Sequence, residues 1–281
     1  MSKIKIAELF YSIQGEGRYM GVPSVFLRTF GCNFKCAGFG MPKGESSEEY
    51  LNVDPGQYTE YGSLPLVSTG CDSYASWDPR FKHLSPLLDT KTIADSIVET
   101  LPYKEWRDEH LVITGGEPLL GWQRSYPELL MHDNMQSLKE LTFETNGTQE
   151  LHNDFKTWLR DYWGETKGYQ SLTFSVSAKL SVSGEPANEA IRPDIVCSYQ
   201  ELGHTYLKFV IATEEDAEEA LEAVDIYRAE GFDGHVYLMP VGGIESVYTL
   251  NNRRVAELAM KMGLRYSDRL QVPLFKNAWG T

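Results

Sequence analysis

Short apolar runs alternate with segments of helical periodicity through the second half of the chain, and this pattern constrains the fold most. The predicted strands cover residues 111–114, 141–145, 172–177, 206–211 and 235–239, with a further short apolar run at 195–197. The predicted helices cover residues 91–101, 127–140, 153–162, 214–230 and 251–262. Apolar strands separated by helices of roughly ten or more residues are typical of repeated β-α units around a mainly parallel sheet, open or barrel-like. The sequence therefore predicts an α/β fold.

The first part of the chain adds two predicted strands, at 4–13 and 23–30, and then a long irregular segment. Residues 37–70 are rich in Gly, Pro, Ser, Glu and Tyr without sustained periodicity, which predicts a loop with at most short helical turns. After this loop, Thr90 or Thr92 is the predicted N-cap of helix 91–101.

Composition excludes several classes of protein. The formal net charge of −14 argues against a broad phosphate-binding face, so we expect no direct nucleic-acid partner. No segment has the apolar length of a signal peptide core or of a membrane span, so we expect a soluble, cytoplasmic protein. Four cysteines are too few for a disulfide framework in a chain of 281 residues, and clustered cysteines then indicate metal binding or catalysis.

Two of these cysteines, Cys32 and Cys36, follow the strand at 23–30. They could hold a metal ion or an iron–sulfur cluster, but two thiols do not complete a site. Cys71 is the candidate third ligand, and a structural zinc site is the rival interpretation, although it has no convincing fourth ligand. Cys197 lies in an apolar run, which predicts a buried thiol.

Polar residues follow the predicted strands where ligands bind in parallel β-α folds. One strand ends in Thr114-Gly115-Gly116-Glu117-Pro118, the next in Glu144-Thr145-Asn146-Gly147, and the next in Ser177-Ala178-Lys179. Paired glycines let the backbone approach a ligand closely. Near the N-terminus, the loop Gln14-Gly15-Glu16-Gly17 is either an ordinary turn or a substrate loop. Arg28 interrupts an apolar strand, so it either extends to the sheet edge or points a cation into a pocket.

These motifs, in this order, resemble the radical S-adenosylmethionine (SAM) superfamily and, within it, the 7-carboxy-7-deazaguanine synthases of queuosine and 7-deazapurine biosynthesis. The resemblance rests on Ser12–Gly17, on Phe26-Leu27-Arg28 leading into Gly31-Cys32, and on Thr114–Pro118. The usual motif of that family spaces three cysteines by three and two residues, and here Phe39 stands at the third position. The segment Gly70–Trp77 resembles the part of the family motif that contains the third cysteine. The simplest account is a 34-residue insertion, residues 37–70, between the second and third ligands.

The resemblance implies a single domain over residues 1–281, built as an open, partial TIM-like barrel with the insertion inside its cluster-binding segment. It implies a 4Fe-4S cluster on Cys32, Cys36 and Cys71, and Mg²⁺ on Ser73. It places SAM on Gly115, Gly116, Glu117, Glu144, Asn146, Ser177, Ala178, Lys179, Met239 and Pro240. It places the substrate on Ile13, Gln14, Gly15, Glu16, Arg28, Thr114, Gln271 and Thr281. Among these, Glu16 and Arg28 are the predicted catalytic residues.

The implied reaction is the radical ring contraction of 6-carboxy-5,6,7,8-tetrahydropterin to 7-carboxy-7-deazaguanine with loss of ammonia, catalysed by a carbon–nitrogen lyase. The implied partners are an electron donor such as flavodoxin and a second copy of the chain in a homodimer. Two alternatives stay open from the residues alone: another radical SAM enzyme, such as a glycyl-radical activase, and a non-catalytic metal-binding protein of the same fold. The sequence assigns no purpose to residues 37–70.

Overall fold

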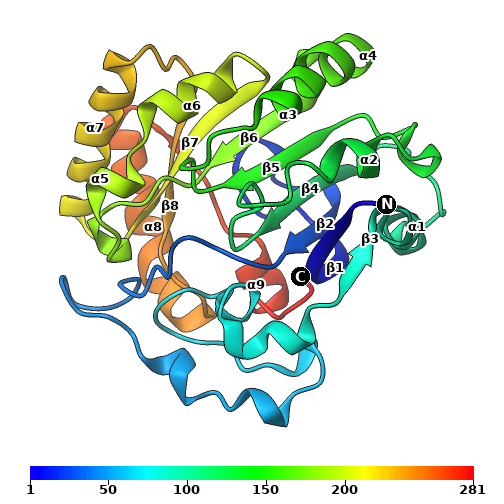
Figure 1. Ribbon diagram of the computed structural model, residues 1–281. Helices are drawn as coiled ribbons and strands as arrows, with labels where there is room; N and C mark the ends of the chain where they lie inside the picture. Colours follow the sequence, from blue (N-terminus) through cyan, green and yellow to red (C-terminus); the bar gives the residue numbers. More distant parts are fainter.

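A computed structural model describes residues 1–281, and its centre is a nine-stranded sheet (Figure 1). The strands lie in the order β3-β1-β2-β4-β5-β6-β7-β8-β9. β1 pairs antiparallel with both β2 and β3, and every pair from β2 to β9 is parallel. The strands are β1 (Lys3–Ile13), β2 (Pro23–Thr29), β3 (Leu87–Asp89), β4 (His110–Gly115), β5 (Leu141–Thr145), β6 (Leu172–Val176), β7 (His204–Ile211), β8 (Val236–Pro240) and β9 (Arg265–Tyr266).

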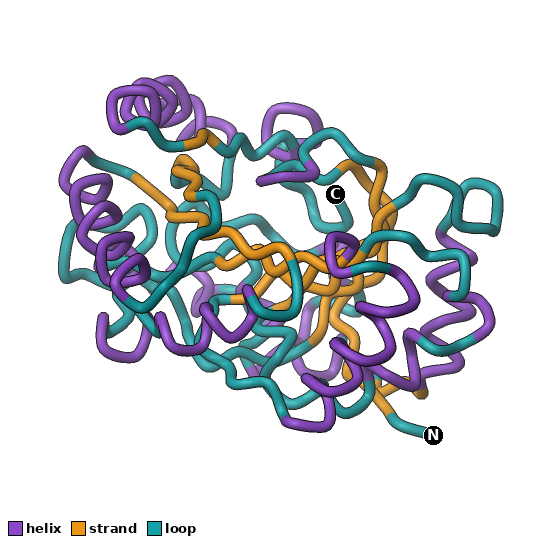
Figure 2. Tube along the Cα trace, turned by 90° about the horizontal axis from the view of Figure 1, so that it is seen from above, coloured by secondary structure: helices purple, strands orange, loops and turns teal.

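The sheet is curved but not closed, because its edge strands β3 and β9 do not pair with each other. Figure 2 shows it as a curved wall with helices along its outer side and the C-terminus inside the curve. The helices are α1 (Thr90–Thr100), α2 (Tyr126–Leu130), α3 (Asn153–Trp158), α4 (Glu165–Lys167), α5 (Ala187–Ala190), α6 (Pro193–Gln200), α7 (Glu214–Ala229), α8 (Glu245–Met262) and α9 (Gln271–Phe275). The predicted α/β fold with an open, barrel-like sheet is confirmed.

The main core lies between the sheet and these helices, where 46 buried residues form one cluster. Strands β4 and β6 are buried along their whole length, and in β6 even the polar residues Thr173 and Ser175, which alternate with the apolar ones, are buried. The short runs of apolar and small polar residues therefore predicted the strands well, because buried strands tolerate small hydroxyl residues such as Thr142 and Thr173. None of the helices is long and apolar enough to cross a lipid bilayer.

Several helix predictions were wrong in extent. The segment 127–140 is helical only in α2 and in a 3-10 turn at Asp133–Met135, because the His132 side chain accepts a hydrogen bond from the Asn134 N–H and starts a new turn there. The predicted helix 153–162 runs on as a π-helical segment, Leu159–Gly164, into α4. The apolar run 195–197 belongs to α6, which begins at Pro193 because proline is favoured in the first turn of a helix.

The predicted caps and ends also differ in places. Asp89, rather than Thr90 or Thr92, caps α1, because its carboxylate accepts a hydrogen bond from the Thr92 N–H at 2.9 Å. Helix α8 begins six residues before the predicted 251–262. The short elements β3, β9, α5 and α9 were not predicted. Cys197, predicted to be buried, is half-buried on α6.

Residues 37–70 form no strand and no α-helix, as predicted. They contain three 3-10 turns, Glu49–Asn52, Pro55–Gln57 and Tyr61–Ser63, and the next such turns are Tyr74–Ser76 and Pro79–Leu84. Further 3-10 turns lie at Gly17–Tyr19, Tyr169–Ser171 and Ser181–Ser183. A separate cluster of eight buried residues, mostly aromatic and aliphatic, lies under the segment and includes Val53, Tyr61, Leu64 and Val67. The segment, which we call the insertion, therefore has a small core of its own.

Candidate active site

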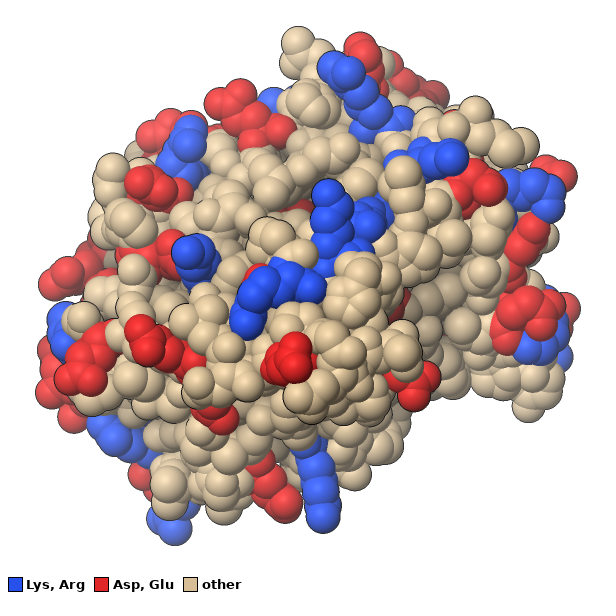
Figure 3. Space-filling model, turned by 60° about the horizontal axis from the view of Figure 1, so that its bottom comes forward, with Lys and Arg blue, Asp and Glu red and all other residues tan.

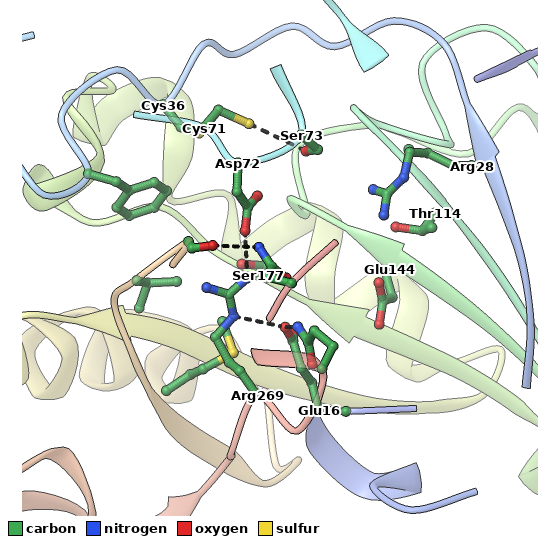
Figure 4. Close-up of a pocket in the computed structure, with 18 of the residues that line it drawn as sticks. Glu16, Arg28, Cys36, Cys71, Asp72, Ser73, Thr114, Glu144, Ser177 and Arg269 are labelled. Atoms are coloured by element: carbon green, nitrogen blue, oxygen red, sulfur yellow. Dashed lines mark hydrogen bonds and ion pairs between the residues drawn. The ribbon is translucent and has the colours of Figure 1, made fainter. Parts of the chain in front are cut away.

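A cavity of about 260 Å³ opens inside the curved sheet, at the carboxyl ends of the parallel strands (Figure 4). Most of the predicted site residues line it: Ile13, Gln14, Gly15, Glu16, Arg28, Cys32, Cys36, Cys71, Ser73, Thr114, Gly115, Gly116, Glu144, Asn146, Ser177, Lys179, Met239, Pro240, Gln271 and Thr281. Only Glu117 and Ala178, of all the predicted residues, are not part of its wall. Residues spread over the whole sequence therefore meet in one place.

The three predicted ligand cysteines come together around Phe34 and Ala190. Cys32 follows β2, Cys36 has the unusual φ of 49°, and Cys71 returns from the far end of the insertion. Burial raises the pKa of all three thiols, that of Cys32 to about 12. Together with the other His, Cys, Asp and Glu side chains, these cysteines form no group of three or more that could hold one metal ion.

Several donors surround the sulfurs. The Phe34 N–H donates to Cys32 Sγ at 3.4 Å, and the Ser73 hydroxyl lies 3.4 Å from Cys71 Sγ. Burial raises the pKa of Cys71, and the Trp77 indole N–H, which has no hydrogen-bond partner in the protein, acts to lower it. Donors aimed at sulfur stabilise a thiolate over a thiol. The cysteine pocket thus suits sulfurs that carry negative charge when a metal group is bound.

Phe39, at the position where the usual motif has its third cysteine, packs against the cysteine group. Its ring centre lies 5.9 Å from the Lys179 ammonium, which suits a cation–π contact. Phe39 also lines the cavity. The residue that breaks the usual spacing is therefore part of the pocket wall.

Hydrogen bonds at the base of the insertion bring its two ends together. The Gly70 N–H donates to the Phe39 carbonyl at 2.7 Å. The Glu49 carboxylate accepts hydrogen bonds from the backbone and hydroxyl groups of both Ser68 and Thr69, at 2.8–3.0 Å. These contacts fix the chain immediately before Cys71. The loop can therefore be long and still deliver the third cysteine to a defined place.

Glu16 is the centre of a buried charge network. Its Oε2 accepts a hydrogen bond from Lys208, and its Oε1 accepts from Gln271 at 2.8 Å and from Arg269 at 3.3 Å. Burial alone would raise the pKa of Glu16, but Lys208 and Arg269 lower it to about 2. The carboxylate is therefore an anion throughout the physiological pH range.

Arg269 joins this network to the cysteine pocket. It also donates to the Asp72 carboxylate and to the Gly242 carbonyl, so it links three segments of the chain (Figure 4). Lys208 and Arg269 were not predicted as site residues. Lys208 carries one usable signal, a lysine inside the apolar strand 206–211. Arg269 stands in Arg269-Leu270-Gln271, a segment that resembles part of the family sequence, but only Gln271 of that segment was predicted as a site residue.

Arg28 lies on the opposite side of the cavity, near Thr114 and Glu144 (Figure 4). Its Nε donates to Glu8 at 2.8 Å, whereas its two terminal amino groups have no hydrogen-bond partner in the protein. Gln14 Nε2 donates to Glu144 at 3.0 Å. The sequence left two possible positions for the Arg28 side chain, and the structure shows the guanidinium pointing into the cavity. Its two terminal amino groups are therefore available to an anionic ligand.

The Gly115-Gly116-Glu117 turn packs closely against the cysteine loop. A Cβ on Gly116 would lie 2.5 Å from the Gly31 carbonyl oxygen, so no other residue fits there. The Glu117 side chain is fully buried and accepts hydrogen bonds from Leu119 N–H at 3.0 Å, Thr145 hydroxyl at 2.8 Å and Asn146 N–H at 2.6 Å. Burial raises the pKa of Glu117 to about 7, although these three hydrogen bonds act to lower it. The carboxylate thus joins the ends of β4 and β5.

Comparison with known proteins decides the family. The chain is 31% identical to the 7-carboxy-7-deazaguanine synthase of Halobacterium salinarum, over 98% of this chain and 91% of that protein. The chain belongs to the 7-carboxy-7-deazaguanine synthase family. It is also 26% identical to the synthase of Pyrobaculum aerophilum, over 99% of this chain and 97% of that one. The chain matches no family model.

The fold of the family is shared as well. The crystal structure of QueE from Escherichia coli matches 95% of this chain and 94% of that chain, with a TM-score of 0.54 and 19% identity. At this identity the likeness shows the fold alone. Membership of the synthase family confirms the resemblance stated from the motifs, and with it the prediction of an enzyme.

Proposed function

We propose that the chain forms 7-carboxy-7-deazaguanine from 6-carboxy-5,6,7,8-tetrahydropterin with loss of ammonia, by radical SAM chemistry. The observation that carries this proposal is the meeting of Cys32, Cys36 and Cys71 beside a cavity that also contains a partly unpaired arginine, Arg28. A cysteine site alone would fit a structural metal. A cysteine site that opens into a pocket for an anion fits a cluster that reacts with a bound ligand.

A 4Fe-4S cluster fits the cysteine pocket in two respects. The three cysteines gather in one cluster at the cavity wall, and a cubane held by cysteine thiolates needs such a grouping. The donors beside Cys32 and Cys71 favour the charged sulfurs that a cluster requires. When bound, the cluster and SAM supply the one-electron chemistry that starts the reaction.

SAM would lie along the strand ends next to the cysteines. Gly115 and Gly116 line the cavity without side chains, so the methionine part of SAM could approach their backbone closely. Ser177 and Lys179 also line the cavity, and Lys179 Nζ donates to Ser177 Oγ at 2.9 Å. Glu144 and Asn146 complete the ribose side, with Met239 and Pro240 beside the adenine. For Glu117 we propose that it shapes this surface, because its side chain is already occupied by three donors.

The substrate would occupy the space between Arg28 and Glu16. The free amino groups of Arg28 suit the carboxylate of the tetrahydropterin, because a guanidinium binds a carboxylate through two parallel hydrogen bonds. Glu16, Gln14 and Gln271 present a carboxylate and amides to the pterin ring. Since Glu16 stays ionised, its role would be to accept hydrogen bonds and hold Lys208 in place rather than to take up a proton.

Magnesium would bind at Ser73, whose hydroxyl lies in the cavity wall. The neighbouring Asp72 carboxylate is occupied by Arg269, so the protein offers few oxygen ligands. Mg²⁺ commonly keeps several waters and takes the remaining ligands from a substrate, which suits such a site. We further propose a cytoplasmic homodimer that is reduced by a flavodoxin-like electron donor.

The experiment that tests the function compares Cys71→Ala with Cys197→Ala after anaerobic reconstitution with iron and sulfide. Cys197 lies on α6, outside the cavity, where it packs against the main core and donates its one hydrogen bond to the Glu230 carbonyl, so it is a matched control. We expect about four irons per chain in the wild type and in Cys197→Ala, with a reduced paramagnetic signal that changes on adding SAM. Cys71→Ala should lose that signal and all conversion of the tetrahydropterin.

The outcomes separate the alternatives. Iron uptake that does not depend on Cys71 would contradict the three-cysteine site. A cluster that responds to SAM without conversion of the tetrahydropterin would favour another radical SAM enzyme, such as a glycyl-radical activase. A protein that takes up no cluster would favour the non-catalytic alternative.

A further inference from the structure

The residues that follow α9 form one wall of the cavity. We call residues 277–281 the tail; Asn277, Ala278, Trp279, Gly280 and Thr281 all line the cavity, together with Arg28 and Gln271. Figure 1 shows the C-terminus beside β1 and close to the segment that follows the insertion. Whatever binds in the cavity therefore meets the tail.

Few hydrogen bonds hold the tail in place. Asn277 donates from its backbone to the Gln271 carbonyl at 3.0 Å and from its side chain to the Gly243 carbonyl at 2.8 Å. Ala278 N–H donates to the Phe275 carbonyl at 3.2 Å. Beyond Ala278, the Thr281 hydroxyl bonds only back to Ala278. Burial raises the pKa of Glu8, and the Gly280 N–H is near enough to this carboxyl to act against that rise. A short segment with so few contacts needs a further anchor to stay ordered.

That anchor is Trp279, whose ring enters the aromatic cluster beneath the insertion. The Trp279 ring centre lies 5.6 Å from that of Tyr61 and 5.7 Å from that of Tyr74, with an edge-to-face angle of 82° to Tyr74. Aromatic pairs at such distances and angles attract each other beyond the effect of burial alone. Tyr61 belongs to the insertion, and Tyr74 follows the third cysteine.

The insertion side of this contact is fixed. The Tyr61 hydroxyl donates to the Ala75 carbonyl at 2.9 Å and lies 2.8 Å from the Ser85 hydroxyl. The Tyr74 hydroxyl donates to the Pro65 carbonyl at 2.9 Å. Both rings are buried and cannot swing away, so they form a rigid surface for Trp279.

The tail in turn lies against the arginine that faces the cavity. Gly280 and Glu8 both line the cavity, and Glu8 pairs with Arg28 Nε at 2.8 Å. The insertion therefore meets the tail at Trp279, and the next residue, Gly280, lies in the same cavity wall as Glu8 and Arg28.

We propose that the insertion serves as a brace for the tail, with Trp279 as a positioning residue for the substrate part of the cavity. This inference rests on the proposed function, because it assigns the tail to the carboxylated substrate rather than to the cluster or SAM. The brace gives residues 37–70 a purpose that requires no second protein. It also explains why a long loop between two ligands has an aromatic core.

The test compares Trp279→Ala with Trp279→Phe and with Trp158→Ala, a tryptophan substitution on α3, away from the cavity. We expect Trp279→Ala to raise KM for the tetrahydropterin by about tenfold with a smaller change in kcat, because a looser wall weakens binding of the substrate. Iron content and the SAM-dependent spectral change should stay at wild-type values. Trp279→Phe should restore most of the affinity, and Trp158→Ala should leave KM unchanged.

A second readout needs neither cluster nor substrate. Lys276 is exposed at the end of α9, so trypsin can remove the tail, and mass spectrometry can follow the loss of residues 277–281. We expect Trp279→Ala and Tyr61→Leu each to speed this cleavage by about tenfold, because a freed tail is open more often. The double variant should be no faster than either single variant, since both remove the same contact.

Two results would overturn the brace. Cleavage at Lys276 that Trp279→Ala leaves unchanged would show that the ring does not hold the tail, whether or not the protein turns over the tetrahydropterin. Loss of iron or of the SAM response in Trp279→Ala would place the residue with the cluster instead. Failure of the proposed function is separate: wild-type protein would then not convert the tetrahydropterin, while the cleavage rates would still test the brace.

Discussion

At the scale of single residues, the pairing of Glu16 leads to a prediction about pH. Its folded-state pKa of about 2 lies below the ordinary value of 4.5, because Lys208 and Arg269 outweigh the effect of burial. A lowered carboxylate pKa stabilises the folded state above the unfolded-state pKa, and that stabilisation is lost as the pH falls toward the folded-state pKa. Glu16→Gln should therefore lower the free energy of unfolding by about 2–3 kcal/mol at pH 7.

Urea unfolding of the metal-free protein between pH 3 and pH 8 measures this effect. The difference between wild type and Glu16→Gln should be constant above about pH 5.5 and shrink below about pH 4.5. Glu257→Gln is the control, because Glu257 lies on the surface of α8 and pairs only with Arg253. A difference that changes between pH 6 and pH 8 would show that Glu16 titrates there, contrary to its observed partners.

The same network shows what sequence alone could and could not give at this scale. Cys32, Arg28 and the strand-end glycines were found because each sits in a local motif with a fixed order. Lys208 and Arg269 were missed because their partner Glu16 is 192 and 253 residues away in the chain. A charge whose partner is so distant looks like any other charge until the fold brings the two together.

At the scale of elements, the insertion depends on Glu49. Its carboxylate accepts hydrogen bonds from Ser68 and Thr69, and so holds the backbone that leads into Cys71. Without this carboxylate, four donors lose their acceptor and the third ligand becomes mobile. We expect Glu49→Ala to lose iron to a chelator about five to ten times faster than wild type, since a mobile ligand leaves more often.

Glu48→Ala is the matched control, because Glu48 is the preceding carboxylate, its side chain is exposed, and it forms no capping hydrogen bond with the turn that follows. Iron release can be followed by the absorbance of the chelator complex under anaerobic conditions. Equal release rates in the two variants would mean that Cys71 is held by other contacts, such as the Gly70–Phe39 hydrogen bond.

Elements were predicted best where one physical cause dominates. Buried parallel strands are short and mostly apolar, with few charged residues, so β4, β5, β6, β7 and β8 were predicted from their runs alone. The prediction of one helix over 127–140 was wrong because the apolar spacing indicates a helix, whereas His132 and Asp133 favour a new turn. The two-residue strand β9 has too little sequence to carry a pattern, and it exists because Tyr237 and Leu238 of β8 offer it a partner.

At the scale of the whole molecule, an open sheet leaves its two ends to be joined by other contacts. β1 and the cysteine loops lie at one end, and β8 and the segment before α9 at the other. Arg269 crosses between them, because it binds Glu16 after β1, Asp72 after the insertion and Gly242 after β8. The sequence predicted the open barrel and the members of the site, but not this closure, which exists only between segments that the fold makes neighbours.

Removing Arg269 should therefore destabilise the whole molecule. Arg269→Met leaves Glu16 and Asp72 without their shared cation, and breaking a buried ion pair on one side costs about 3–5 kcal/mol. Arg253→Met is the control: Arg253 forms an exposed pair with Glu257 on α8, and such pairs contribute at most about 0.5 kcal/mol. Urea unfolding of the metal-free protein at pH 7 measures both variants.

A double variant separates two effects of losing Arg269: the lost contact between the two ends of the sheet, and the Asp72 carboxylate left without a cation. Adding Asp72→Asn to Arg269→Met removes one carboxylate that has lost its partner, so the double variant should be more stable than Arg269→Met alone by about 1 kcal/mol or more. Part of the loss should persist, because the contact between the two ends of the sheet is still absent. Equal stability of Arg269→Met and wild type would mean that the cysteine loops and the tail close the open barrel without it.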